Sequence, residues 1–390
     1  MCPLRDPIPA VVISPLLPEP PVTGGQKRTL RLLEAMARAG LEPRILTTDV
    51  GEPGAAEQLR MRGWAVEIVP EHERTQLDRL RQHAQRLPSP FLPELSARLK
   101  TLAADAALVQ YEHTQSAYYA APPGVPTVLS LHNVDSAAAR TAASGRRGVS
   151  WLRERNRAAA LRAVERRVLP HADRVLCVSE DDAAAVTRAG GHALLAPNGV
   201  DDEFFSVNCP GDDDRVLFFG HFGYEANRRG IERFLTEGWP EVLRARPQAR
   251  LALAGGGMDV SLGRFEGVDV LGRVADLAAV VGAARAVVVP IWEGGGTRLK
   301  VLEALAAARA VVSTPLGASG VGFEHGRHGL LAESPIALGS ALVSVLGDPA
   351  QASTLGREGR ILAERFRWKE ALSAASAFYS EVMGRARFAV

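Results

Sequence analysis

Short apolar runs alternate with longer amphipathic segments along this 390-residue chain. Short runs that are rich in β-branched side chains are typical of buried strands, and segments of helical periodicity fill the gaps between them. The runs fall at residues 9–14, 44–48, 65–69, 107–111, 127–131, 174–179, 215–219, 250–254, 268–271, 286–290 and 310–313. This alternation predicts an α/β fold that contains two doubly wound parallel sheets.

The length of the chain indicates two domains, and a change in composition indicates where they meet. Residues 194–202 (LLAPNGVDD) contain an Asn-Gly turn signal, and residues 204–214 are polar and contain glycine, as linkers do. We therefore predict Rossmann-like domains at residues 1–205 and 206–367. Residues 368–390 follow, and their apolar positions recur at helical spacing.

Residues 290–307 (PIWEGGGTRLKVLEALAA) place a glycine-rich loop between a predicted strand and a predicted helix. Thr297 is in position to cap the helix, and Gly295 and Gly296 have no side chains that would block an approaching ligand. The N–H groups at the start of a helix and its positive dipole end bind anions. The stretch therefore predicts an anion site.

Charged residues in the first turns of the same helix extend this prediction. Arg298 and Lys300 add two cations where cations are unfavourable unless an anion is present. Glu303 lies about 9 Å from Thr297 along the helix axis, where a carboxylate can accept hydrogen bonds from a ribose. Together the residues predict a site for a nucleoside diphosphate. In the alternative interpretation Lys300 and Glu303 form an exposed ion pair beside a loop without a ligand.

Other candidate residues follow predicted strands near the start of the chain. Gly24 and Gly25 precede a helix predicted at residues 26–39, so either a ligand approaches them or they form a simple turn. Glu112 and His113 follow the strand at 107–111. His132 and Asn133 follow the strand at 127–131. Residues at these strand ends are candidates for ligand contacts, although a lone histidine there is often structural.

Composition and cysteine spacing argue against several classes of function. A net charge of +2 gives no support to a nucleic-acid-binding protein. Cys2, Cys177 and Cys209 are widely spaced, which argues against a disulfide framework and a zinc site. The chain has neither an apolar stretch of about 18 residues nor a signal-peptide pattern, so we expect a cytoplasmic protein.

Residues 140–174 form the most arginine-rich segment, and a helix is predicted at residues 151–169, where Pro170 follows. Such a helix is most simply a solvated surface element that packs on its domain. The alternatives are contact with anionic lipid headgroups, which would make the protein peripheral to a membrane, or contact with a charged acceptor.

The sequence GGGTRLKVLEA at residues 294–304 resembles the donor-binding signature of the retaining glycosyltransferases of family 4, or group 1, which have the GT-B fold. LHN at residues 131–133, PNGVD at 197–201 and the glycine pair at 24–25 are similar to further elements of that family. Nine residues separate Glu293 from Glu303, whereas the commonest family spacing is seven. The resemblance therefore assigns the ribose contact to Glu303 and leaves Glu293 unassigned.

This resemblance implies an architecture and an activity. The two domains would face an interdomain cleft, with an acceptor-side domain at 1–205 and a donor-binding domain at 206–367. The helix in residues 368–390 would cross back to the first domain. The enzyme would transfer a sugar, with retention and without a metal ion, from a nucleotide sugar. A UDP-sugar is favoured, GDP- or dTDP-sugars are alternatives, and no cofactor is expected.

The resemblance also implies roles for individual residues. Catalysis would involve three side chains, and donor binding would involve backbone and side-chain groups of several loops. The expected catalytic residues are His132, which would hydrogen-bond the donor sugar, and Arg298 and Lys300, which would bind the diphosphate. The expected donor-binding residues are Gly24, Gly25, Gly295, Gly296, Thr297, Glu303, Val274 in the base-reading stretch LGRV, and His221.

His221 lies in the loop GHFGYEANRRG, where many family members have an arginine and a lysine for the diphosphate. If Arg298 and Lys300 do not make the main contacts with the diphosphate, Arg228 or Arg229 in this loop would make them instead. Glu112, His113 and Asn133 would lie on the acceptor side. The acceptor itself, whether a saccharide, a lipid-linked molecule or a small molecule, cannot be chosen from the sequence.

Two other functions stay open. A nucleotide-sugar epimerase of the same fold would turn over without an acceptor, and a non-catalytic sugar-nucleotide binder would show affinity without turnover.

Overall fold

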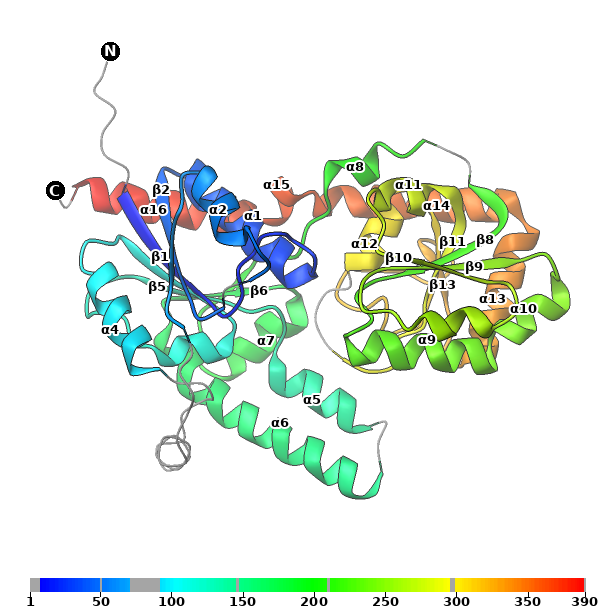
Figure 1. Cartoon of the computed structure of the whole chain (residues 1–390), viewed down its shortest axis with the longest axis horizontal. Helices are drawn as coiled ribbons and strands as arrows, with labels where there is room; N and C mark the ends of the chain where they lie inside the picture. The colour runs from blue at the N-terminus through cyan, green and yellow to red at the C-terminus, as the bar shows by residue number, and fades with distance from the viewer. Residues whose placement is uncertain are drawn as a thin grey trace, which may run out of the picture. The chain divides into compact units, whose positions relative to one another are not determined.

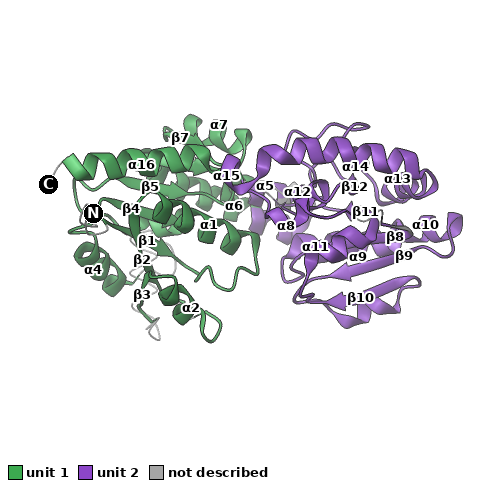
Figure 2. Ribbon diagram, turned by 90° about the horizontal axis from the view of Figure 1, so that it is seen from above, with its two compact units in different colours: residues 1–137, 155–197, 372–390 green, residues 138–154, 198–371 purple. Residues whose placement is uncertain are grey.

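The computed structural model describes residues 8–49, 51–70, 92–144, 147–208, 211–294 and 299–388. The chain divides into two compact units, which Figure 2 colours separately. Unit 1 comprises Met1–Ala137, Arg155–Pro197 and Leu372–Val390. Unit 2 comprises Ala138–Glu154 and Asn198–Ala371. The units thus divide after Pro197 and after Ala371, whereas the sequence places the domain boundaries at 205 and 367.

Within the described residues, unit 1 contains one sheet of seven parallel strands in the order β3-β2-β1-β4-β5-β6-β7 (Figure 1). The strands are β1 (Ile8–Ser14), β2 (Leu41–Thr47), β3 (Ala65–Ile68), β4 (Leu108–Glu112), β5 (Thr127–Ser130), β6 (Arg174–Cys177) and β7 (Ala193–Leu195). The strand order reverses between β1 and β4. In open α/β sheets, ligands bind beyond the carboxyl ends of the strands at such a reversal.

The helices of unit 1 cover both faces of this sheet. Val109 and Tyr111 of β4 belong to the core that includes α4 and α7, so Gln110 and Glu112 project from the opposite face. That face is covered by α1 and by the C-terminal helix α16, which contact each other. The helical elements of unit 1 are α1 (Gly24–Arg38), α2 (Ala55–Met61), α4 (Pro93–Leu102), η1 (Thr114–Tyr118), η2 (Leu169–His171), α7 (Glu180–Arg188) and α16 (Ser373–Phe388). Helices α5 (Asp135–Ser144) and α6 (Gly148–Val168) are divided between the two units, because residues 138–154 belong to unit 2.

Unit 2 contains, within the described residues, six parallel strands in the order β10-β9-β8-β11-β12-β13. They are β8 (Asp212–Phe219), β9 (Arg250–Ala254), β10 (Val268–Gly272), β11 (Ala284–Val289), β12 (Ala310–Ser313) and β13 (Gly329–Leu331). The order reverses between β8 and β11. The prediction of two doubly wound parallel sheets is therefore confirmed in both units.

Two apolar cores lie on opposite faces of the second sheet. Val287 and Val289 of β11 belong to one core, and Ala286 and Val288 belong to the other, because successive side chains of a strand alternate between its faces. Helices α8, α11 and α12 contact the first core, α9, α10 and α13 contact the second, and α14 contributes to both. The elements are α8 (Asp202–Phe205), α9 (Glu225–Glu237), α10 (Trp239–Ala245), η3 (Val260–Arg264), α11 (Leu277–Ala283), α12 (Leu299–Ala306), α13 (Pro335–Gly347), α14 (Pro349–Ala363), η4 (Glu364–Phe366) and α15 (Trp368–Ala371).

Helix α1 begins earlier than the sequence predicted. Thr23 caps it: the Thr23 hydroxyl oxygen accepts from the Gln26 N–H at 3.2 Å, and the Gln26 side-chain oxygen accepts from the Thr23 N–H at 3.0 Å. This reciprocal capping box starts the helix at Gly24. The prediction of a glycine loop before residue 26 is therefore wrong, because Gly24 and Gly25 form the first turn of α1.

None of the helices in the described part of the chain is long and apolar enough to cross a membrane. The arginine-rich helix α6 begins at Gly148, three residues before the predicted start at 151, and ends at Val168, where η2 with Pro170 follows.

Candidate functional site

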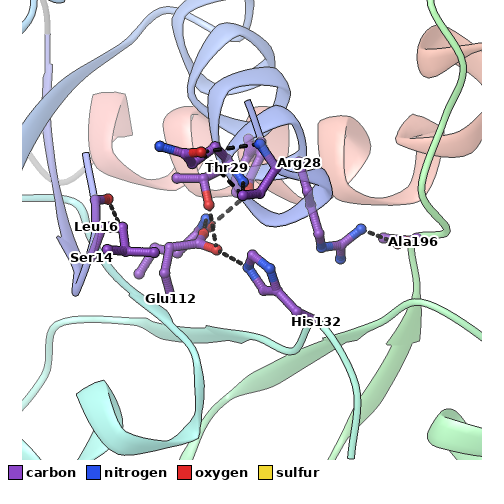
Figure 3. Close-up of polar contacts among 11 residues, drawn as sticks. Ser14, Leu16, Arg28, Thr29, Glu112, His132 and Ala196 are labelled. Carbon is purple, nitrogen blue, oxygen red and sulfur yellow. Dashed lines mark hydrogen bonds and ion pairs between the residues drawn. The ribbon is translucent and has the colours of Figure 1, made fainter. Parts of the chain in front are cut away.

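Glu112, the last residue of β4, is the centre of a buried polar cluster in unit 1 (Figure 3). Its side chain is fully buried. One carboxylate oxygen, Oε1, accepts from Gln110 Nε2 at 2.6 Å. The other, Oε2, accepts from the Thr29 hydroxyl at 3.0 Å and lies 2.8 Å from His132 Nε2. Three polar side chains therefore converge on one buried carboxyl group, which gives both of its oxygens hydrogen-bond partners.

His132 and His113 stack on each other beside this carboxylate. Their ring centroids are 3.9 Å apart, with 26° between the ring planes. His113 has a positive φ of 67°, which turns the chain at the end of β4. Burial lowers the pKa of His113 well below its usual value, and the nearby His132 and Arg28 lower it further. The His113 ring is therefore neutral near pH 7.

The glycine pair of α1 lies against His132. A β-carbon at Gly25 would be 2.8 Å from Nδ1 and 3.2 Å from Cε1 of the imidazole. Such distances are shorter than a carbon contact allows, so only glycine leaves space for the ring here. Gly25 therefore lies directly against the His132 ring. Gly24 is the first residue of α1.

The cluster continues into the interior of unit 1. The Tyr379 hydroxyl of α16 donates to Gln110 Oε1 at 2.7 Å, and Arg28 Nη1 donates to the carbonyl oxygen of Ala196 at 2.7 Å. Burial raises the pKa of Tyr379 and lowers the pKa of Arg28, and the neighbouring Glu112 partly offsets the change at Arg28. A continuous set of polar contacts therefore links the C-terminal helix to His132.

Asn133 follows His132 and is half-buried in the turn before α5. Asp135 begins that helix, and burial raises the pKa of its carboxyl group, with nearby Glu165 adding to the rise. His132 lowers the pKa of Asp135, so these two ionisable groups interact across the same turn.

Lys300 occupies the corresponding place in unit 2, at the carboxyl end of β8. Its Nζ atom donates to Asn227 Oδ1 at 2.5 Å and lies 4.5 Å from the centroid of the Phe218 ring. A β-carbon at Gly220 would lie 3.1 Å from Nζ. Asn227 is itself held, because its Nδ2 donates to the His221 carbonyl oxygen at 2.8 Å. The ammonium group therefore lies beside the strand reversal at which α/β sheets bind ligands.

Glu303 lies on α12, the same helix as Lys300, and is buried. The alternative interpretation, in which Lys300 and Glu303 form an exposed ion pair, is therefore wrong, because the Glu303 side chain is buried. The predicted residues Gly295, Gly296, Thr297 and Arg298 lie outside the described residues.

The remaining predicted residues of unit 2 lie around the ends of β8 and β10. His221 is exposed, and a β-carbon at Gly223 would be 2.5 Å from its ring. Val274 is half-buried and packs against the core on the α12 side of the sheet. Arg228 lies 3.1 Å from Glu232, and Arg229 lies 3.0 Å from Glu293, so both candidate replacements are paired with carboxylates.

No group of three or more His, Cys, Asp or Glu side chains in the described ranges could hold a metal ion.

The sequence did not identify several residues of these clusters. Gln110 is one of them: it lies two residues before the candidate Glu112 on β4, and two polar residues at that spacing within an apolar strand were a usable signal of a buried polar contact. Thr29 lies one helical turn after Gly25, which also places it toward the strand ends. Tyr379 was interpreted as part of an apolar helical stripe, and nothing local to it indicates its partner Gln110.

Two family models match the chain. One is described as Glycosyltransferase Family 4 and matches residues 22–204. The other is described as Glycosyl transferases group 1 and matches residues 213–348. Together they cover the end of β4, where the Glu112 cluster lies, and the end of β8, beside which the Lys300 ammonium lies.

A curated relative, described as an uncharacterized 44.6 kDa protein in the cps region of Klebsiella pneumoniae, is 23% identical over 186 residues. The match covers 44% of this chain and 47% of the relative, so it spans about half the length of that protein.

Solved structures resemble the whole chain. Sucrose-phosphate synthase from Thermosynechococcus elongatus is 22% identical with a TM-score of 0.69, over 97% of this chain and 100% of that chain. HepE from Anabaena, in complex with UDP-glucose, is 16% identical with a TM-score of 0.65, over 97% and 100%. These similarities confirm the predicted fold class, two Rossmann-like domains of the GT-B type.

Proposed function

Because this chain belongs to the group 1 glycosyltransferases of family 4, we propose that it transfers a sugar from a nucleoside diphosphate to an acceptor hydroxyl with retention of anomeric configuration. The observation that carries this proposal is the placement of the Lys300 ammonium beside Gly220 at the carboxyl end of β8. A cation that is fixed in advance at a strand reversal is suited to an anionic ligand.

The roles within unit 2 follow from charge. Lys300, together with Arg298, would bind the diphosphate and stabilise the negative charge that it gains as the sugar departs. Glu303 would accept hydrogen bonds from the ribose, and the backbone near Val274 would contact the base. These cations would do the work of a metal ion, so we propose that transfer needs none. The UDP-glucose complex of HepE supports a UDP-sugar as the donor.

In unit 1, we propose that His132 hydrogen-bonds the transferred sugar. Retention would follow if the acceptor hydroxyl attacks on the face that the diphosphate leaves. A departing phosphate oxygen would then take the acceptor proton, and the bond from the sugar to the phosphate would break as the new glycosidic bond forms. No separate protein base is required for this proton transfer.

The acceptor side is proposed to include a membrane surface. Helix α6 carries exposed arginines at Arg153, Arg162 and Arg166, and exposed apolar side chains at Val149 and Leu152 near its start. Cationic and apolar side chains on one helix suit an anionic lipid surface. A saccharide carried by a lipid in such a membrane would then be the acceptor.

Calorimetric titration tests the donor proposal. UDP, GDP and dTDP are each titrated into the protein in the presence of a chelator, and then into Lys300→Ala, Glu303→Gln and the control Lys369→Ala. Lys369 is an exposed lysine of α15, so its removal should leave binding unchanged. We expect one nucleotide to bind, with affinity about 10- to 100-fold lower in the Lys300 variant, the range for a charge-assisted hydrogen bond.

The proposal fails if none of the three nucleotides binds, or if the Lys300 and Glu303 variants bind as tightly as Lys369→Ala. If binding requires added Mg²⁺, the metal-free mechanism is contradicted and the nucleotide-binding proposal is not. Circular dichroism of each variant separates loss of the site from loss of the fold.

A further inference from the structure

We propose that Glu112 is a positioning residue for His132, which fixes the imidazole hydrogen on Nε2 and leaves Nδ1 as the nitrogen that accepts a hydrogen bond from a ligand. The assignment of the ligand as the transferred sugar rests on the proposed function. The assignment of the tautomer does not, because it depends only on contacts within unit 1.

The burial of Glu112 argues against direct contact with an acceptor. Its side chain has no exposed area, while the His132 side chain keeps 12% of its area exposed. A substrate can therefore reach the imidazole but not the carboxylate. The sequence placed Glu112 on the acceptor side, and the structure instead places it behind His132.

The direction of each hydrogen bond around Glu112 is determined by its neighbours. Gln110 Oε1 accepts from the Tyr379 hydroxyl, which turns the Gln110 amide so that Nε2 donates to Glu112 Oε1. The Thr29 hydroxyl donates to Oε2. A carboxylate can only accept, so the imidazole nitrogen 2.8 Å from Oε2 must carry a hydrogen.

The ring is also fixed in orientation. His113 stacks on one face at 3.9 Å between centroids, and α1 approaches the edge of the ring that carries Nδ1 and Cε1. The position that a β-carbon of Gly25 would occupy is 2.8 Å from Nδ1. Because Gly25 has no side chain, only its main chain lies near this edge of the ring. The stacking on His113 and the contact with Glu112 therefore hold the imidazole in one orientation.

This arrangement assigns a function to the C-terminal helix. Tyr379 of α16 orients Gln110, Gln110 orients Glu112, and Glu112 orients His132, and these contacts lie within unit 1. The chain therefore needs its final helix not only for packing but also to set the hydrogen-bonding state of the histidine. A third group that orients a histidine is a recurring device in catalytic sites.

Nitrogen NMR of the full-length protein with ¹⁵N-labelled histidine tests the proposal, because the ring nitrogens that carry and lack a hydrogen resonate far apart. His132 is identified among the nine histidines by its loss in His132→Asn. In the wild type near pH 7 we expect the hydrogen on Nε2. In Glu112→Gln the amide oxygen should remain toward Gln110 Nε2, which donates to it. The new amide nitrogen then faces His132 and can only donate, so the hydrogen should move to Nδ1.

Glu165→Gln is the matched control. Glu165 is also a buried carboxylate of unit 1, but it accepts from the backbone N–H and hydroxyl of Ser136, at 2.8 and 2.5 Å, and not from His132. This variant should leave the His132 tautomer unchanged. A role of Glu112 in folding alone would not exchange the two nitrogen resonances of His132.

The proposal is overturned if wild-type His132 carries its hydrogen on Nδ1, a result that needs no variant to fold. It is also overturned if Glu112→Gln keeps the wild-type tautomer. Nucleotide titration separates this result from the proposed function. Absence of UDP, GDP and dTDP binding would remove the glycosyl-transfer proposal and leave the tautomer assignment standing. If a nucleotide binds but Glu112→Gln keeps the wild-type tautomer, the glycosyl-transfer proposal stands and the positioning role of Glu112 is overturned.

Discussion

Gly199 lies directly against Trp368, so that a β-carbon at position 199 would be 2.6 Å from Cδ2 of the indole and 2.7 Å from the tryptophan Cα. The adjacent Val200 N–H donates to the Phe366 carbonyl oxygen at 2.7 Å. Two distant parts of the sequence thus hold each other at one end of unit 2. The close approach to a main-chain atom means that a rotamer change of Trp368 cannot relieve an added side chain.

Replacing Gly199 with alanine should therefore destabilise unit 2. We expect a loss of about 1–3 kcal/mol in the free energy of unfolding, the usual cost of overpacking a tight site. Urea unfolding followed by tryptophan fluorescence measures it. Gly347→Ala is the control, since a β-carbon there meets no atom within 4 Å. Equal stability of the two variants would show that the Gly199 contact relaxes without cost.

Asn227 should matter for nucleotide binding although it is neutral. It contacts the Lys300 ammonium through its side-chain oxygen, so Asn227→Ala removes one of the contacts that hold the lysine in place before it binds. We expect the affinity for the nucleotide that binds wild type to fall about 3- to 10-fold, less than in Lys300→Ala.

The control for this change is Arg228→Ala on the same helix. Arg228 pairs with Glu232 in an exposed ion pair, and its removal should leave nucleotide affinity unaltered. If Arg228→Ala weakens binding more than Asn227→Ala, the diphosphate contact belongs to the arginine instead.

Several features of this molecule were readable from the sequence because a physical cause acts locally. Strands that are covered on both faces, such as β1 and β11, contain short apolar runs that the sequence shows directly. The start of α1 was also encoded locally, since the Thr23 and Gln26 pair is a capping-box pattern. Gly24 and Gly25 are poor helix formers, which is why the predicted start was too late.

Other features depend on contacts that no local pattern contains. Strands β7 and β13 have three residues each and lie at sheet edges, so they carry too little apolar sequence to predict. The Tyr379 side chain lies in an apolar helical stripe, and only the folded chain brings it to Gln110. The burial of Glu303 and the position of Glu112 behind His132 likewise depend on tertiary packing rather than on spacing.

The arginines of α6 should bind anionic membranes if the proposed acceptor is lipid-linked. We expect co-sedimentation with vesicles of phosphatidylglycerol and phosphatidylcholine but not with phosphatidylcholine alone. Arg162→Gln with Arg166→Gln should weaken vesicle binding about 10- to 30-fold, because each arginine near such a surface contributes about 1 kcal/mol. Arg233→Gln with Arg244→Gln is the control, since these arginines pair with Glu237 and Glu241. Equal binding to both vesicle types would remove the membrane contact from the proposal.

His113 should make the stability of unit 1 dependent on pH. Burial lowers its pKa in the folded state, while in the unfolded chain it takes up a proton near pH 6.5. Below that pH the unfolded state binds the extra proton, so stability is complete above about pH 6.5 and falls as the pH drops. The loss from this one group approaches about 1.4 kcal/mol per pH unit, continuing down to the lowered folded-state pKa.

His113→Asn isolates this contribution, because asparagine does not titrate and, like histidine, carries a β-carbon in the unusual backbone conformation of φ 67° and ψ 152°. Urea unfolding at pH 7.5, 6.5 and 5.5 should give a steeper decline for the wild type than for the variant. His328 in unit 2 has a pKa that burial also lowers, so it adds a decline of the same sign to both proteins. Only the difference between the two slopes reports on His113. Parallel slopes would mean that the stacked ring accepts a proton in the folded protein as readily as in the unfolded chain.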